Sequence, residues 1–165
     1  MASLSQRLRS NARLFRFFMN LHPAIRASGG TTTYIAPDFS EMRVKLRLKR
    51  ITRNYVGTIF GGSMYASVDP HYMIMLIHRL GPDYLVWDKS ASIRFKKPGR
   101  QTLYATFRVP DDEVETIKRL LKLDPKIDRT YAVELVDKNG VVHAVIDKVV
   151  QVRRKDARQT TPASG

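Results

Sequence analysis

Residues 62–80, GSMYASVDPHYMIMLIHRL, are the one long apolar segment of this chain and constrain its fold more than any other feature. Their length and periodicity predict a helix, and Gly81 followed by Pro82 is a typical helix stop. A helix that is apolar on nearly every side has to be covered on nearly every side. We therefore expect an α+β fold in which an antiparallel sheet wraps around one long central helix.

The rest of the chain supplies strands for such a sheet. The clearest is residues 41–51, where apolar and basic side chains alternate strictly, as in a half-buried strand. Turns are predicted at Pro98-Gly99 and at Asn139-Gly140, and residues 110–123 read as a surface helix with acids first and bases last. The expected strands are residues 32–35, 41–51, 84–98, 101–109 and the two arms of a hairpin over 129–154.

Composition limits the classes of function. A chain of 165 residues with 43% hydrophobic residues suits one domain. Without cysteine there is no disulfide, no thiolate metal site and no cysteine nucleophile, and no apolar run approaches the ~20 residues of a membrane-spanning helix. The formal net charge of +14 would attract nucleic acid, anionic lipid or a phosphorylated cofactor. No RNA-binding aromatic motif, helix-turn-helix or zinc finger accompanies this charge, so nucleic acid is not the expected partner.

The N-terminal residues 1–28 contain five arginines, and no acid precedes Asp38. Their apolar residues recur at helical spacing, which predicts a basic amphipathic helix outside a domain that spans residues 29–154. Three interpretations stay open: a mitochondrial presequence, a transient contact with a membrane surface, and a helix that packs on the domain. We expect a cytoplasmic protein, or a mitochondrial one if the helix is a presequence. The polar residues 155–165 are expected to be a disordered tail.

The candidate chemistry lies at the start of the long apolar segment. The four histidines have no metal-ligand spacing, and no known phosphate or dinucleotide loop occurs, so we expect neither a metal nor a cofactor. Gly61 and Gly62 would let a ligand approach the N–H groups of a helix start. Asp69 stands in an apolar setting directly before Pro70, where a carboxylate is costly unless it is paired or functional. In the alternative interpretation, Asp69 caps a helix that restarts at Pro70.

The stretch NYVGTIFGG at residues 54–62, followed by Asp69, resembles the N-H-x-G-x-x-H-G-G…D/E signature of hotdog-fold acyl-CoA thioesterases of the phenylacetate-pathway and hydroxybenzoyl-CoA type. Residues 90–109, SASIRFKKPGRQTLYATFRV, look like a strand pair of the same enzymes. Residues 54–77 and 83–99 are similar to an uncharacterised subgroup that carries Phe where the signature has its second histidine. The resemblance spans about residues 31–153.

This resemblance implies an acyl-CoA or similar thioester as substrate, and a homodimer, or a tetramer of such dimers, with sheets joined edge to edge. The active sites would lie at the dimer interface. Gly61 and Gly62 would polarise the thioester carbonyl through their N–H groups, Asp69 would act as base or nucleophile, and Asn54 would position water or substrate.

The remaining candidates would bind the two ends of an acyl-CoA. Residues at the helix start and along the helix would line the acyl pocket, although residues at such helical spacing more often form a core; they are Phe60, Ser63, Met64, Tyr65 and Met73. Basic residues at the strand-to-turn corner would meet the CoA phosphates, although a solvated turn explains them as well; they are Arg94, Lys96, Lys97 and Arg100.

Phe60 departs from the hydrolases, because it cannot donate a hydrogen bond as histidine does, and losing one oxyanion donor costs roughly a hundred- to a thousand-fold in rate. A protein that binds acyl ligands without cleaving them is therefore a second hypothesis.

Overall fold

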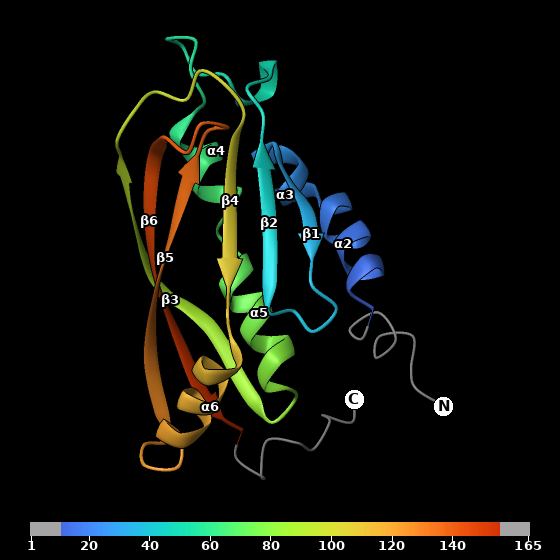
Figure 1. Ribbon diagram of the computed structural model, residues 1–165, viewed down its shortest axis with the longest axis vertical. Helices are drawn as coiled ribbons and strands as arrows, with labels where there is room; N and C mark the ends of the chain where they lie inside the picture. Colours follow the sequence, from blue (N-terminus) through green and yellow to red (C-terminus); the bar gives the residue numbers. More distant parts are fainter. Residues whose placement is uncertain (1–10, 156–165) are drawn as a thin grey trace, which may run out of the picture.

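The computed structural model of the protein describes residues 11–155, which form one six-stranded sheet with helices packed against it (Figure 1). The strands are β1 (Gly30–Ile35), β2 (Glu41–Leu46), β3 (Tyr84–Phe95), β4 (Leu103–Arg108), β5 (Lys126–Val136) and β6 (Val142–Arg154). Their order across the sheet is β1-β2-β4-β5-β6-β3, and all neighbours are antiparallel. The two edge strands are therefore β1 and β3.

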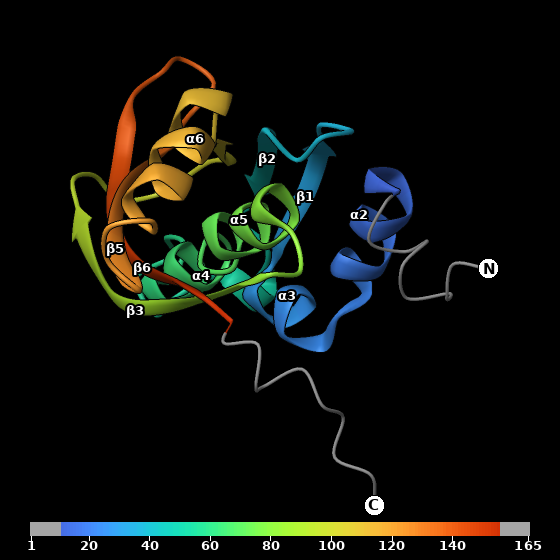
Figure 2. The same ribbon diagram turned by 90° about the horizontal axis from the view of Figure 1, so that it is seen from below.

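The helical segments of the described residues are α2 (Ala12–Leu21), α3 (Pro23–Ser28), the 3-10 helix η1 (Arg50–Thr52), α4 (Gly61–Ala66), α5 (His71–Leu80) and α6 (Asp111–Leu120). Figure 2 shows the sheet curving around α4 and α5. The predicted α+β fold, with an antiparallel sheet around a central helical segment, is confirmed.

The core lies between α5 and the concave face of the sheet. Met75 and Leu76 of α5 are fully buried. The alternation predicted within residues 41–51 is confirmed, since its buried members are Met42, Val44 and Leu46. The strand ends at Leu46, however, and η1 follows where the pattern predicted further strand.

The prediction of one unbroken helix over residues 62–80 is wrong, because residues 67–70 form a turn between α4 and α5. Pro70 directly precedes α5, and it has no N–H with which to continue the helical hydrogen bonds. No side chain caps α5. The restart at Pro70 is therefore real, but the interpretation of Asp69 as its cap is wrong, and the Asp69 carboxylate has a different partner.

The N-terminal segment forms two helices, because Pro23 begins α3 immediately after α2. Helix α2 lies along the outer edge of β1, where the Asn20 side chain donates to the backbone oxygen of Thr32 (2.9 Å) and accepts from its N–H (2.8 Å). The Phe15 ring packs edge-on against Phe39, with 5.6 Å between centroids. The segment thus packs on the sheet and covers the β1 edge.

Residues 1–10 and 156–165 lie outside the described residues, and most of the predicted tail falls there. Lys155, where the tail was expected to begin, donates from its N–H to the Asp83 carbonyl (2.9 Å). The presequence, the disordered tail and the division at residue 29 stay predictions. Within residues 11–155, no helix has the length and apolar character needed to cross a membrane.

Candidate functional site

A lysine lies buried on the concave face of the sheet. Lys148 belongs to β6, and its side chain is 1% exposed. Alternation along the strand puts it on the same face as the fully buried Ile146 and Val150. An isolated ammonium group in such surroundings would be costly, so it requires charged partners.

Two carboxylates meet this ammonium group. The Nζ atom of Lys148 lies 2.5 Å from Oδ1 of Asp69 and 2.8 Å from Oδ2 of Asp88. Asp69 comes from the turn between α4 and α5, whereas Asp88 comes from β3. The β3 register against β6 shifts between Asp88 and Ser90, and such bulges re-aim side chains. We call Asp69, Lys148 and Asp88 the Asp-Lys-Asp cluster.

The two carboxyl groups of the cluster differ in acidity. Burial raises the pKa of Asp69, but hydrogen bonds from Lys148 and Tyr65 and the charge of Lys148 outweigh burial and hold this pKa below its usual range. At Asp88, burial dominates and raises the pKa, the charge of Asp69 adds to the rise, and Lys148 opposes it. Burial lowers the pKa of Lys148, but its bonds to both carboxylates outweigh this and raise it. Asp69 is therefore the stronger acid, ionised beside a charged lysine.

One oxygen of the cluster has no hydrogen-bond partner among the described residues. Oδ1 of Asp88 is buried and accepts from no donor. An ionised carboxylate with such an oxygen loses the hydration of that oxygen without compensation, which agrees with the raised pKa of Asp88. A proton, or a donor group on a bound molecule, would be stabilised at this position.

Next to the cluster, His71 is fully buried and has a structural role. Its Nδ1 donates to the Val68 carbonyl (3.1 Å), and its Nε2 accepts from the Thr32 hydroxyl (3.1 Å). The ring stacks on Phe107, with 4.6 Å between centroids. Burial lowers the pKa of His71 to about 4, so the ring is neutral at physiological pH. It ties the turn that carries Asp69 to strand β1.

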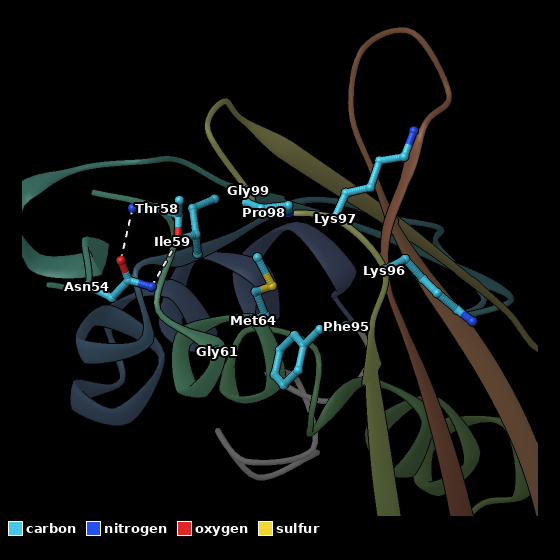
Figure 3. A pocket seen from close by; sticks show the side chains of 10 residues that line it. All are labelled: Asn54, Thr58, Ile59, Gly61, Met64, Phe95, Lys96, Lys97, Pro98 and Gly99. Carbon is cyan, nitrogen blue, oxygen red and sulfur yellow. Dashed lines mark hydrogen bonds between the residues drawn. The ribbon is translucent and has the colours of Figure 1, made fainter. Parts of the chain in front are cut away.

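A cavity of about 370 Å³, which we call the α4 cavity, lies where α4 begins (Figure 3). Gly61 and Met64 of α4 line it, together with Asn54 from the preceding loop and the corner that follows β3. Lys96 and Lys97 stand at its rim, and Figure 3 shows their side chains pointing outward. The α4 cavity thus joins the predicted oxyanion residue Gly61 to two of the predicted phosphate-binding residues.

Asn54 holds its own loop together. Its Oδ1 accepts from the Thr58 N–H, and its Nδ2 donates to the Thr58 hydroxyl, both at 2.9 Å (Figure 3). Gly57, with φ at +80°, closes the turn between them. A carboxamide has two hydrogens and two acceptor sites, so Asn54 keeps one of each for another partner.

The paired glycines leave room for two aromatic rings. A Cβ atom on Gly61 would lie 2.7 Å from the Phe95 ring, and one on Gly62 would lie 2.3 Å from the Phe60 ring. The first hydrogen bond of α4 runs from the Met64 N–H to the Phe60 carbonyl (3.1 Å), so the three N–H groups before it have no acceptor within the helix. The two glycines therefore allow the rings of Phe95 and Phe60 to pack against the start of α4, where an oxyanion site was predicted.

The predicted catalytic residues do not all meet within one chain. Asp69 borders a second cavity, of about 540 Å³, which lies between the N-terminal helices and the α4–α5 pair. Tyr65 also lines this second cavity, whereas Gly61 lines the α4 cavity. Gly61 and Asp69 of one chain therefore face different cavities.

The other predicted substrate residues are scattered. Ser63 and Met64 are buried in α4, and Met73 packs against the core without lining either cavity. The exposed Arg94 forms an ion pair with Asp147 across the strands. The remaining two are exposed and line neither cavity: Phe60, at the start of α4, and Arg100.

Lys148 and Asp88 were not among the candidate site residues predicted from the sequence. Lys148 is in phase with Ile146 and Val150, so period-two alternation over residues 142–154 was a sufficient signal for a buried cation. Asp88 had no such signal, because the bulge beside it breaks the alternation that would assign it to a face. Across residues 11–155, no group of three or more His, Cys, Asp or Glu side chains could hold a metal ion.

Comparison with known proteins places the chain among hotdog folds. The family model described as "Domain of unknown function (DUF4442)" matches residues 10–152. No curated protein gives a significant match. A protein of unknown function from Pseudomonas aeruginosa, named a probable thioesterase, aligns with a TM-score of 0.78 and 16% identity over 87% of this chain and 95% of its own. A Haemophilus influenzae thioesterase aligns with a TM-score of 0.64 and 10% identity over 87% and 91%, respectively.

Proposed function

Because the chain belongs to the family described as "Domain of unknown function (DUF4442)" and has the hotdog fold, we propose that it hydrolyses an acyl thioester, with acyl-CoA as the substrate class. The names of the two structural neighbours support this proposal. The observation that carries it is the Asp-Lys-Asp cluster. A buried lysine keeps the Asp69 carboxylate ionised at the border of a cavity large enough for a ligand.

Asp69 has two routes to the hydrolysis of a thioester. As general base, it removes a proton from water while the water oxygen bonds to the acyl carbon; the C–S bond then breaks and the thiolate takes up a proton. As nucleophile, it bonds to the acyl carbon itself while the C–S bond breaks and the departing thiolate takes up a proton; water then cleaves the resulting anhydride, which releases the acid and restores the Asp69 carboxylate. Both routes need an ionised carboxylate at neutral pH, which the low pKa of Asp69 supplies.

In this proposal the active site is completed by a second subunit. The N–H groups of Gly61 and Gly62 stabilise the oxyanion, and Asn54 positions water or substrate with its remaining hydrogen-bonding capacity. Because Gly61 and Asp69 of one chain face different cavities, the helix start of one protomer has to meet Asp69 of its partner. Edge-to-edge pairing of β3 in a homodimer would provide this arrangement.

The CoA phosphates are assigned to the rim of the α4 cavity. Lys96 and Lys97 extend outward there, next to the helix start. Arg94 is already paired with Asp147, so we expect it to contribute less than the two lysines. Arg100 completes the predicted set of cations at this corner.

A second candidate function is binding of an acyl thioester without cleavage, and Phe60 favours it. Its ring lies over Gly62 at the start of α4, where the resembling hydrolases carry histidine. A phenyl ring neither donates a hydrogen bond nor carries a proton. If the helix amides alone stabilise the oxyanion too weakly, the site would bind its ligand and release no thiol.

Thiol release from acetyl-, octanoyl- and palmitoyl-CoA tests the proposal, with wild type compared with Asp69→Asn. We expect the substitution to lower kcat by about a hundred-fold or more, because it removes the base or nucleophile. Asp83→Asn, at an exposed aspartate, is the matched control and should retain activity.

Two results would count against hydrolysis. Equal turnover by wild type and Asp69→Asn would exclude Asp69 as the base. No turnover of any acyl-CoA, together with binding of a non-hydrolysable S-alkyl-CoA thioether, would favour the second candidate. In that case Phe60→His, which restores a donor, is the variant expected to gain turnover.

A further inference from the structure

The second cavity, which we call the N-terminal groove, has two apolar walls. The wall from α2 and α3 includes Phe15, Phe18 and Ile25, and the wall from α4 and α5 includes Ala66 and Ile74. Its volume of about 540 Å³ exceeds the 370 Å³ of the α4 cavity and falls within the usual range for small-molecule sites. Helices α2 and α3, which were predicted to lie outside the domain, thus form one wall of the larger of the two cavities.

The charges of the groove contrast with those of the whole chain. The sequence carries a formal net charge of +14, yet none of the described residues that line the groove is Lys or Arg. Asp69 is its one acidic residue, and it is ionised. A phosphate or free carboxylate would meet no Lys or Arg in the described lining, and the buried Lys148 nearby is already paired with Asp69. A neutral, apolar ligand suits this groove.

We infer that the N-terminal groove binds the acyl chain of the thioester, and that the substrates are thioesters of long hydrocarbon chains. The identity of the ligand rests on the proposed function. The reacting carbonyl has to lie beside Asp69, and from that point the groove continues as an apolar channel between the two pairs of helices. Short or polar acyl groups would leave most of its apolar wall in contact with water.

The same geometry helps the product to leave. The thioester group and acyl chain are neutral, so they approach the ionised Asp69 without repulsion. Hydrolysis turns the acyl group into a carboxylate beside Asp69, and two like charges at short range repel each other; Lys148 is already paired with Asp69 and Asp88, so it offsets only part of this repulsion. The groove therefore favours the thioester over the free fatty acid.

Binding of two CoA thioethers tests the inference independently of turnover, because a thioether is not hydrolysed. We expect S-dodecyl-CoA to bind at least about ten-fold more tightly than S-ethyl-CoA, because each buried methylene adds to the affinity. Calorimetry at several temperatures should give a more negative heat-capacity change for the dodecyl compound, as burial of apolar surface requires.

A matched pair of variants tests the position of the chain. Ala24 and Ala27 are both exposed on α3, but only Ala24 lines the groove. Ala24→Phe should fill the groove and abolish the preference for S-dodecyl-CoA, whereas Ala27→Phe should retain it. Both substitutions have the same cost in helix propensity, and neither lies in the core.

The outcomes separate this inference from the proposed function. Equal affinity for both thioethers, or equal effects of Ala24→Phe and Ala27→Phe, would overturn the groove assignment even if acyl-CoA is hydrolysed. If no acyl-CoA is hydrolysed but the thioethers behave as expected, the hydrolase proposal fails and the groove assignment stands. If S-dodecyl-CoA binds and Ala24→Phe blocks it only by changing the oligomeric state in sedimentation, the groove is an interface between copies.

Discussion

Lys148 holds its ammonium group between the carboxylates of Asp69 and Asp88 at 1% exposure of its side chain. The lysine compensates the burial of both acids, and the acids compensate the burial of the lysine. The three side chains come from β6, β3 and the α4–α5 turn, so the cluster also fixes how the helices sit on the sheet. Lys148 thus determines both the charge state and the position of the carboxylates at the candidate site.

Replacing Lys148 should change the pH dependence of activity. In Lys148→Met, Asp69 loses its main hydrogen-bond donor and its cation but stays half-buried, so its pKa should rise. Hydrolysis needs the ionised form, so the acid limb of kcat/KM should move to higher pH. Lys148→Arg keeps the charge and should leave the limb near its wild-type position. An unchanged limb in a folded Lys148→Met protein would contradict this role.

His71 should make stability depend on pH below neutrality. Burial lowers its pKa from 6.5 to about 4, so the unfolded chain binds a proton in this interval that the folded chain does not. The contribution of His71 to the free energy of unfolding is complete above pH 6.5 and is lost as pH falls toward 4. The total loss is about 3 kcal/mol. Urea unfolding across this interval measures the slope, and it should be shallower in His71→Gln. Equal slopes would show that the ring is protonated in the fold.

Helix α2 is apolar on two opposite faces. Its buried face packs Ala12 and Met19 toward the sheet. The other face exposes residues at the i, i+3, i+4, i+7 spacing of a helical stripe: Leu14, Phe17, Phe18 and Leu21, which are 38–58% exposed. Of these, Phe18 also lines the N-terminal groove. No acid precedes Asp38 in the sequence. This stripe, in basic surroundings, supports the proposal of a transient contact with an anionic membrane surface.

Vesicle co-sedimentation tests the α2 stripe. We expect binding to vesicles that contain phosphatidylserine, weaker binding at high salt, and a loss of several-fold in Phe17→Ser/Leu21→Ser, because both apolar contact and charge contribute. The control replaces two exposed apolar residues elsewhere, Ile51→Ser/Leu123→Ser, and should bind like wild type. Equal binding by both double variants would leave charge alone as the cause and exclude the stripe.

For the whole molecule, the two edges of the sheet differ. Helix α2 covers β1, and Asn20 satisfies the backbone of Thr32 there. β3 spans 12 residues at the other edge, and residues 89–92 are exposed on both of its faces. A long bare edge favours pairing with another strand, which supports the proposed homodimer.

Sedimentation velocity tests this dimer. Ser92→Lys puts a positive charge on the β3 edge of both protomers, and like charges facing each other across paired strands are destabilising. We expect the dimer dissociation constant to rise by about ten-fold. Thr130→Lys, an exposed position on the central strand β5, should not change it. A monomeric wild type, or equal effects of the two substitutions, would contradict pairing through β3.

Much of the fold could be predicted from the pattern of neighbouring residues. A residue whose position depends on pairing with a distant strand could not be predicted in this way. The alternation over residues 41–51, of which β2 takes residues 41–46, and the apolar run after Gly62 predicted the sheet and its central helical segment. Asp69 stood out because a carboxylate in an apolar run is anomalous within the sequence itself. Asp88 did not, because its face depends on a bulge that exists only when β3 pairs with β6.

The periodicity of neighbouring residues was enough to specify which faces of β2 and α6 are apolar, since it depends on backbone geometry alone. The site required contacts between residues far apart in the chain. Asp69 and Lys148 are separated by 79 positions, and they meet because Pro70 interrupts the helix and the register of β6 points the lysine inward. The pKa of each group, and the groove beneath the N-terminal helices, follow from packing, because burial and the distance between charges are properties of the folded chain.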